Sequence, residues 1–270
     1  MAYHMTKIAG IVVSDDRSAL EDFFASEWMD IAREAKRARG LFSVALSGGK
    51  TPAPFFRALA EASLVEASLV EAGDGQLWRS THLFMVDERI VPHEDDASNW
   101  KMMNETLFGF GRGPIPAGNI HPVPTGCRPE ACARLYEKDI RAFFKNKTGL
   151  EGGPPVLDLV HLGLGSDGHT ASLFPGAPAL KEKKHLAVAV PGGAMHDRVT
   201  LTYPVINNAR NIIFLVMGGD KAGALARVAE KDPSLPASAV SPRKGRLLIL
   251  ADRQAASGLA PGSYELLKRR

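Results

Sequence analysis

The segment from His161 to Gly176, HLGLGSDGHTASLFPG, holds the residues best suited to chemistry. A tight glycine turn after an apolar stretch would present Asp167 and His169 side by side. A histidine side chain ordinarily has a pKa of about 6.5, so it can take a proton from water near neutral pH. A neighbouring carboxylate can fix the tautomer of the ring and support the imidazolium that forms. We therefore expect an acid–base pair here; the alternative is a loop histidine that only hydrogen-bonds the backbone.

The same segment also spells G-x-G-x-x-G between Gly163 and Gly168, the spacing of a dinucleotide-binding turn. In a dinucleotide-binding protein the last glycine opens a long helix, whose N-terminus holds the pyrophosphate. Here Pro175, Gly176 and Pro178 interrupt the chain soon after the last glycine. The pattern therefore argues against a nicotinamide cofactor.

A second cluster, LSGGKTP, places two glycines, a lysine and a hydroxyl directly after an apolar stretch. Backbone N–H groups in such a turn, together with the N-terminus of a helix starting near Pro52, form an anion cradle. An ordinary strand-to-helix turn is the alternative. The glycine and lysine spacing differs from that of the nucleotide P-loop. The residues expected to bind an anionic group are Ser47, Gly48, Gly49, Lys50 and Thr51.

A third cluster lies in VDERIVPHEDDASNW, where three charged residues follow the apolar stretch HLFMV. Arg89 is placed to meet a substrate oxygen, with Asp87 or Glu88 orienting it. A solvated charged loop is the alternative. Ser98–Asn99 resembles a cap for the helix that follows.

Metal and disulfide chemistry receive little support from the remaining residues. The other histidines share no metal-binding spacing, and His161 reads as a satisfied core residue, so no metal is expected. Cys127 and Cys132 form no Cys-x-x-Cys pattern, and we expect neither a disulfide nor a zinc site. A reducing cytoplasm is therefore the expected location.

The formal charge of +3 and the pI of about 8.8 suit a small anionic ligand better than a nucleic acid. No apolar run is long enough to span a membrane, and the first residues lack the features of a secretory signal. We expect residues 1–7 to be disordered or to derive from an expression tag. Residues 8–270 are expected to form one domain.

Apolar strand-like stretches alternate with helical patterns along the chain. This order predicts an α/β fold, Rossmann-like, with a mostly parallel sheet flanked by helices on both faces. The clusters described above follow strands, and ligands of such sheets bind beyond the carboxyl ends of the strands. The expected strands are residues 8–14, 42–46, 82–86, 156–165, 211–219 and 246–250, and the clearest helices are residues 18–38 and 220–230.

Taken in order, SGGKTP, DERIVP followed by SN, and GLGSDGHTASLFPG resemble the motifs of the 6-phosphogluconolactonase family. The resemblance covers nearly the whole chain. It implies hydrolysis of 6-phospho-D-glucono-1,5-lactone to 6-phosphogluconate in the oxidative pentose phosphate pathway. It also implies the fold of the glucosamine-6-phosphate deaminase superfamily, without metal or organic cofactor, and a protein that is often monomeric.

The resemblance also implies roles for individual residues. His169 resembles the general base that activates water, with Asp167 beside it, and Arg89 resembles the arginine at the reacting end of the sugar. SGGKTP resembles the phosphate cradle. Arg198 and Lys221 match basic positions that hold the phosphate in the wider superfamily.

Two departures and two alternatives remain. Many members of the family carry a lysine shortly before Arg198, whereas this chain reads PGGAMHDR; another basic residue substitutes, or His196 takes part, or the lysine is dispensable. Lys50 stands where relatives more often have serine.

A phosphosugar deaminase or isomerase is disfavoured by Phe174, where deaminases carry glutamate, and by Arg89, where they tend to have tyrosine. A non-catalytic sugar-phosphate sensor would not need His169.

Overall fold

The structure, a computed structural model of the chain, describes residues 10–69, 75–108, 115–192 and 195–267. The N-terminal segment 1–7 lies outside the described residues, and so do the first two positions of the strand expected at 8–14. The described strands are β1 (Gly10–Ser14), β2 (Phe42–Leu46), β3 (Thr81–Met85), β4 (Asp87–Arg89), β5 (Ile120–His121), β6 (Leu159–Gly163), β7 (Ala187–Val190), β8 (Arg198–Leu201), β9 (Asn211–Val216), β10 (Arg246–Asp252) and β11 (Glu265–Leu266).

The helices are α1 (Arg17–Arg39), α2 (Pro52–Leu69), α3 (Gly75–Arg79), α4 (Asn99–Met103), α5 (Pro129–Thr148), α6 (Tyr203–Ile206) and α7 (Ala222–Ala229). Short helical turns are η1 (Asn104–Phe108), η2 (Ala117–Asn119), η3 (Pro178–Lys181), η4 (Gly219–Lys221), η5 (Pro236–Ala239) and η6 (Ala255–Gly258). No helix in the described ranges is both long enough and apolar enough to cross a membrane.

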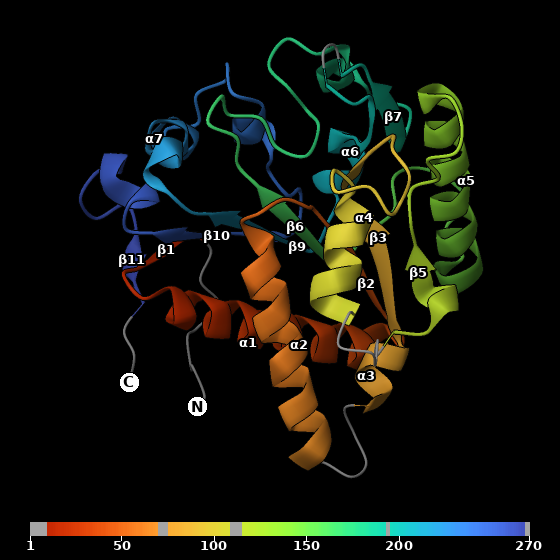
Figure 1. The fold of residues 1–270 in the computed structure, drawn as a ribbon, viewed down its shortest axis with the longest axis horizontal. Helices are drawn as coiled ribbons and strands as arrows, with labels where there is room; N and C mark the ends of the chain where they lie inside the picture. Colours follow the sequence, from red (N-terminus) through yellow and green to blue (C-terminus); the bar gives the residue numbers. More distant parts are fainter. Residues whose placement is uncertain (1–9, 70–74, 109–114, 193–194, 268–270) are drawn as a thin grey trace.

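The larger sheet has the order β11-β1-β10-β9-β6-β2-β3-β5, and its neighbouring strands are parallel (Figure 1). The parallel sheet predicted from the alternation of strands and helices is therefore confirmed. In a parallel sheet the carboxyl ends of the strands share one edge. Residues that follow β2, β3, β6 and β9 are thus brought to the same place, although they lie far apart in the chain.

Helices cover both faces of this sheet, as expected. Phe42 of β2 packs against Trp28 of α1, with 5.4 Å between the ring centroids. Phe84 of β3 packs against Phe143 of α5 at 5.2 Å. Because Phe84 pairs with Ala45, and successive residues of a strand point to opposite faces, Phe84 and Phe42 lie on opposite faces. The two long helices therefore enclose the sheet from opposite sides (Figure 1).

Helix α1 begins and ends where its local sequence dictates. The side chain of Asp16 accepts hydrogen bonds from the N–H groups of Ser18 at 2.9 Å and Ala19 at 3.4 Å, which caps the first turn. At the other end Gly40 has φ +76°, and its N–H donates to the carbonyl of Lys36 at 2.8 Å. A glycine in this left-handed conformation is a common helix terminus.

A second sheet, β4-β8-β7, was not expected from the sequence. Its strands are antiparallel, with Arg89 opposite Arg198. Each strand has only three or four residues, too few for an alternating pattern to be distinctive. This small sheet is what carries Asp87, Arg89 and Arg198 beside the carboxyl edge of the large sheet.

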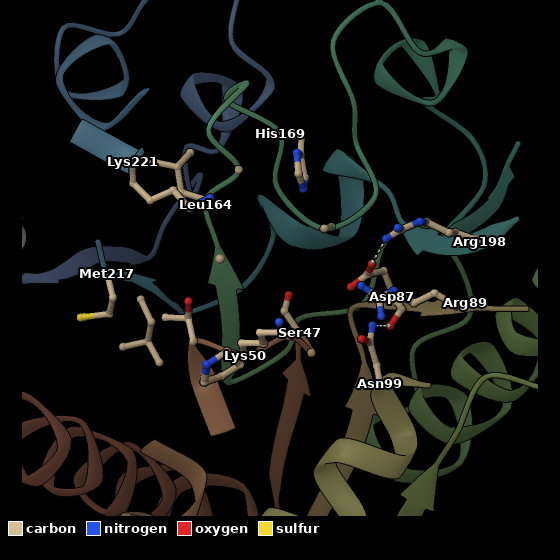
Figure 2. A pocket seen from close by; sticks show the side chains of 18 residues that line it. Ser47, Lys50, Asp87, Arg89, Asn99, Leu164, His169, Arg198, Met217 and Lys221 are labelled. Atoms are coloured by element: carbon tan, nitrogen blue, oxygen red, sulfur yellow. Dashed lines mark hydrogen bonds and ion pairs between the residues drawn. The ribbon is translucent and has the colours of Figure 1, made fainter. Parts of the chain in front are cut away.

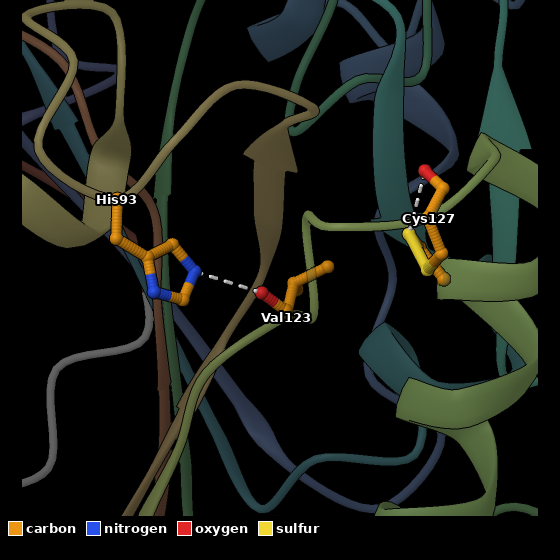
Figure 3. The surroundings of a disulfide bond; sticks show 4 residues. His93, Val123 and Cys127 are labelled. Atoms are coloured by element: carbon orange, nitrogen blue, oxygen red, sulfur yellow. Dashed lines mark hydrogen bonds between the residues drawn. A yellow bond between two sulfur atoms is a disulfide. The ribbon is translucent and has the colours of Figure 1, made fainter.

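The prediction of no disulfide is wrong. Cys127 and Cys132 are bonded, with their Cα atoms 5.7 Å apart (Figure 3). The turn into α5 brings the two residues within the range that a disulfide spans. Nearby, Nε2 of His93 lies 3.0 Å from the carbonyl oxygen of Val123, which joins this segment to the loop after β4.

His161 is a core residue, as predicted, but it is not a satisfied one. Its ring lies in β6 between Phe24, at 6.0 Å between centroids, and Phe56, at 5.4 Å. The residue is fully buried, and neither ring nitrogen has a hydrogen-bond partner among the described residues. The apolar environment lowers the pKa of His161 to about 3, so the ring is neutral.

Candidate active site

A pocket lies at the carboxyl edge of the parallel sheet and gathers nearly all of the predicted site residues (Figure 2). The predicted residues that line it are Ser47, Gly48, Gly49, Lys50, Thr51, Asp87, Arg89, His169, Arg198 and Lys221. Asp167 does not line the pocket; its side chain is exposed and contacts His169, which does. Lining residues that the sequence did not single out include Asn99, Leu164, Ala171, Leu215 and Met217.

His169 is held by Asp167. Its Nδ1 lies 2.5 Å from Oδ1 of Asp167, and its backbone N–H donates to the same oxygen at 3.1 Å. Because Nδ1 faces the carboxylate, the other ring nitrogen, Nε2, is the one left to act on a ligand; the ring points into the pocket in Figure 2. Burial acts to raise the pKa of Asp167, but the hydrogen bonds and charge of His169 outweigh it, and that pKa falls below its usual value.

The glycine turn that presents this pair has no room for a side chain at Gly165. A Cβ at Gly165 would lie 2.1 Å from Nδ1 of His169 and 2.6 Å from Oδ1 of Asp167. The turn closes with a hydrogen bond from the N–H of Gly165 to the carbonyl of His169, at 2.8 Å, and Gly168 has φ +81°. The glycine turn thus holds His169 against Asp167, and it leads into no long helix.

The SGGKTP segment forms one wall of the pocket. It leaves the end of β2 with Gly49 at φ +111° and enters α2 at Pro52, so exposed backbone N–H groups and a helix N-terminus face the same space. The hydroxyl of Ser47 is buried and has no hydrogen-bond partner among the described residues. A bound anion would supply the partner that this hydroxyl lacks.

Arg89 and Arg198 form the opposite wall. Nη1 of Arg89 donates to the carbonyl of Ala97 at 2.6 Å, while its buried Nε has no partner within the described part of the chain. Nη1 of Arg198 lies 4.0 Å from Oδ2 of Asp87, which also accepts from the hydroxyl of Ser172 at 2.7 Å. Burial and the charge of Arg89 lower the pKa of Arg198, and the charge of Asp87 opposes them.

Glu88 holds the backbone of this wall in place by hydrogen bonds, although it does not line the pocket. Its carboxylate is fully buried and accepts from the N–H groups of Arg89 at 2.7 Å, Asn99 at 2.8 Å and Trp100 at 2.7 Å. Burial raises the pKa of Glu88, and these backbone hydrogen bonds act in the opposite direction. Of the two carboxylates considered from the sequence, Glu88 therefore fixes the backbone at Arg89, and Asp87 faces the ligand space.

Phe174 lies between the imidazole and an arginine. Its ring is 4.6 Å from that of His169 between centroids, and the guanidinium of Arg198 lies 5.4 Å from its centre. An aromatic ring attracts a cation at this distance. The preceding Ala171, which lines the pocket, has φ +53°, a conformation uncommon for alanine.

The basic residues are distributed over two sides of the pocket. In Figure 2 Lys50 and Lys221 lie on one side, and Arg89 and Arg198 on the other. Lys221 also pairs with Asp220 at 3.0 Å. His196, which the sequence offered as one substitute for the lysine that many family members carry before Arg198, does not line the pocket.

The described residues contain no group of three or more His, Cys, Asp or Glu side chains placed to hold a metal ion. The pocket instead combines a histidine–carboxylate pair, two arginines and an anion cradle with two lysines. This set can bind a phosphorylated ligand at one end and abstract a proton at the other.

Comparisons with known proteins identify relatives in sequence and in fold. The 6-phosphogluconolactonase of Synechocystis sp. is 40% identical over 227 residues, which cover 83% of this chain and 87% of that protein. The solved structure of 6-phosphogluconolactonase from Trypanosoma cruzi matches with a TM-score of 0.78 at 31% identity, over 96% of this chain and all of that one. A monomeric glucosamine-6-phosphate deaminase, 20% identical, matches in fold with a TM-score of 0.73 over 92% of this chain and 99% of that one.

The profile of the family described as glucosamine-6-phosphate isomerases/6-phosphogluconolactonase matches residues 15–249. The resemblance inferred from the motifs is confirmed: this chain belongs to that family.

Proposed function

We propose that this protein hydrolyses 6-phospho-D-glucono-1,5-lactone to 6-phosphogluconate, the second step of the oxidative pentose phosphate pathway. The observation that carries the proposal is the His169–Asp167 pair, which faces two arginines in a pocket that also holds an anion cradle. The names of the 6-phosphogluconolactonases from Synechocystis sp. and Trypanosoma cruzi support the same substrate.

In the proposed reaction the phosphate binds at the cradle, near Lys50 and Lys221, and this positions the lactone carbonyl at the other end. Nε2 of His169 takes a proton from water as the water oxygen bonds to the carbonyl carbon. Arg89 stabilises the negative charge that develops on the carbonyl oxygen. The bond from this carbon to the ring oxygen then breaks, and the imidazolium returns its proton to the ring oxygen, which gives the open-chain acid.

The environment of His169 favours hydrolysis over deamination. Opening and deaminating an amino sugar requires an additional acid to protonate the amine, and the apolar ring of Phe174 occupies the space next to the imidazole. Lactone hydrolysis needs only one group that accepts and returns a proton. The paired Asp167 also supports catalysis rather than passive sensing, because binding alone does not require an oriented imidazole.

The proposal is tested by proton release from freshly generated 6-phosphogluconolactone, compared with its spontaneous hydrolysis. A parallel assay measures ammonia release from glucosamine 6-phosphate. We expect a rate well above the spontaneous one in the first assay and no ammonia in the second. A lactone rate equal to the spontaneous one would refute the proposal, and ammonia release would favour the deaminase alternative.

A further inference from the structure

Asn99 lines the pocket but has no part in the reaction proposed above. The sequence indicated only that Ser98–Asn99 begins a helix, and the capping hydrogen bond belongs to Ser98, whose hydroxyl accepts from the N–H of Lys101 at 3.2 Å. The side chain of Asn99 is therefore not needed for the cap. With 2% of its surface exposed, this residue is enclosed within the wall of the site.

Strand β4 holds one end of the Asn99 side chain. Nδ2 of Asn99 donates to the carbonyl oxygen of Asp87 at 2.9 Å (Figure 2). The backbone N–H of Asn99 donates to the buried carboxylate of Glu88 at 2.8 Å. Two hydrogen bonds thus fix Asn99 to the segment that carries Asp87 and Arg89.

The other end of the side chain rests on the anion cradle. A Cβ built on Gly48 would lie 2.1 Å from Oδ1 of Asn99, 2.2 Å from its Cγ and 2.6 Å from its Cβ. Oδ1, Cγ and Cβ of Asn99 therefore lie directly over the Cα of Gly48. No residue larger than glycine fits there unless Asn99 moves, so the cradle and the side chain are in mutual contact.

We propose that Asn99 is a positioning residue that sets the distance between the anion cradle and the reacting end of the pocket. The inference rests on the proposed function, because the distance matters only for a ligand that is held at both ends. A phosphorylated lactone anchored at Ser47–Thr51 must reach His169 and Arg89 with its carbonyl carbon. Misplacement of a reacting group by about 1 Å can cost roughly 100-fold in rate.

The test compares Asn99→Ala with the matched control Ser98→Ala on two substrates, 6-phosphogluconolactone and glucono-1,5-lactone, which lacks the phosphate. Ser98→Ala removes the neighbouring cap of the same helix, together with the hydrogen bond that Ser98 Oγ donates to Glu88 at 3.2 Å, and it keeps the amide side chain of Asn99. For Asn99→Ala we expect kcat/KM to fall roughly 10- to 100-fold on the phosphorylated lactone and much less on the other. For Ser98→Ala the ratio between the two substrates should stay that of the wild type.

A binding measurement separates this inference from the proposed function. Calorimetry on the same proteins gives Kd for inorganic phosphate, which occupies only the cradle, and for 6-phosphogluconate, which reaches both ends. Asn99→Ala should bind phosphate as the wild type does and 6-phosphogluconate about tenfold more weakly.

An equal loss for both lactones, or for both ligands, would overturn the positioning role and show a general collapse of the site. Failure of the wild type to hydrolyse either lactone would refute the proposed function. In that case the two Kd values would still decide whether Asn99 sets the distance.

Discussion

The imidazole of His169 has one nitrogen left to act on a ligand, because Asp167 holds the other. The lowered pKa of Asp167 keeps this carboxylate ionised at neutral pH, so it can support an imidazolium. Replacing Asp167 with asparagine keeps the shape, removes the charge and allows the ring to turn. We expect kcat for 6-phosphogluconolactone to fall roughly 10- to 100-fold, with circular dichroism unchanged. A kcat within about twofold of the wild type would remove the orienting role.

The variant Lys221→Met tests whether the two sides of the pocket bind different parts of the substrate. It lies on the side of Lys50, away from Arg198 (Figure 2). Lys221→Met should raise KM for the phosphorylated lactone roughly tenfold, because a charge-assisted hydrogen bond to phosphate is lost. The same change should leave hydrolysis of glucono-1,5-lactone nearly unaffected. Equal effects on the two substrates would place Lys221 at the reacting end instead.

At the scale of structural elements, the turn after β6 determines where the acid–base pair lies. Gly165→Ala would place a methyl group 2.1 Å from Nδ1 of His169. We expect kcat to fall roughly 100-fold, because the ring must move from its position. Gly163→Ala, where a Cβ meets no atom within 4 Å, should reduce kcat far less. Similar losses in the two variants would contradict the claim that the contact with His169 limits the turn, since a methyl group at Gly163, which also lines the pocket, touches no atom of the protein.

Strand β6 contains a buried histidine that makes the fold sensitive to acid. The folded-state pKa of His161 is about 3, and the unfolded chain titrates near 6.5. Between these values only the unfolded chain binds the proton, so stability falls as the pH is lowered, by up to ~1.4 kcal/mol per pH unit. Above about pH 6.5 the ring of His161 is neutral in both the folded and the unfolded chain, so this acid-dependent loss of stability is absent there.

His161→Leu should be more stable than the wild type by ~1–3 kcal/mol at pH 7, because it removes two unpaired buried nitrogens. The difference in the free energy of unfolding should widen towards pH 4. Urea denaturation at several pH values measures it. Burial and the charges of His121 and Lys147 lower the pKa of His82 to about 4. His82 therefore remains a source of acid sensitivity in both proteins. A difference that stays constant with pH would contradict the account of His161.

Across the whole molecule, the ends of the expected strands predicted which residues meet in one pocket. Glycines and charged residues directly after apolar stretches identified both the cradle and the His169 turn, because a parallel sheet brings its carboxyl ends to one edge. The helix expected at residues 18–38 agrees with α1 to within one residue at each end, because its caps, Asp16 and Gly40, act locally.

What the sequence did not predict depends on contacts between distant segments. Strands β7 and β8 are too short to show a period, and they form because β8 pairs with β4, more than 100 residues earlier in the chain. The role of Asn99 depends on Gly48, which belongs to another element. His161 was expected to find a hydrogen-bond partner, and only the positions of Phe24 and Phe56 show that its surroundings are apolar.

We propose that His169 activates water, while other residues of the pocket bind the phosphorylated sugar. The most direct test is the enzyme-dependent rate of 6-phosphogluconolactone hydrolysis by His169→Ala, measured with the Kd for 6-phosphogluconate on the same protein. We expect the rate to fall by roughly 100- to 10,000-fold while the product still binds with nearly the wild-type Kd. A variant that binds product and hydrolyses the lactone at the wild-type rate would contradict it.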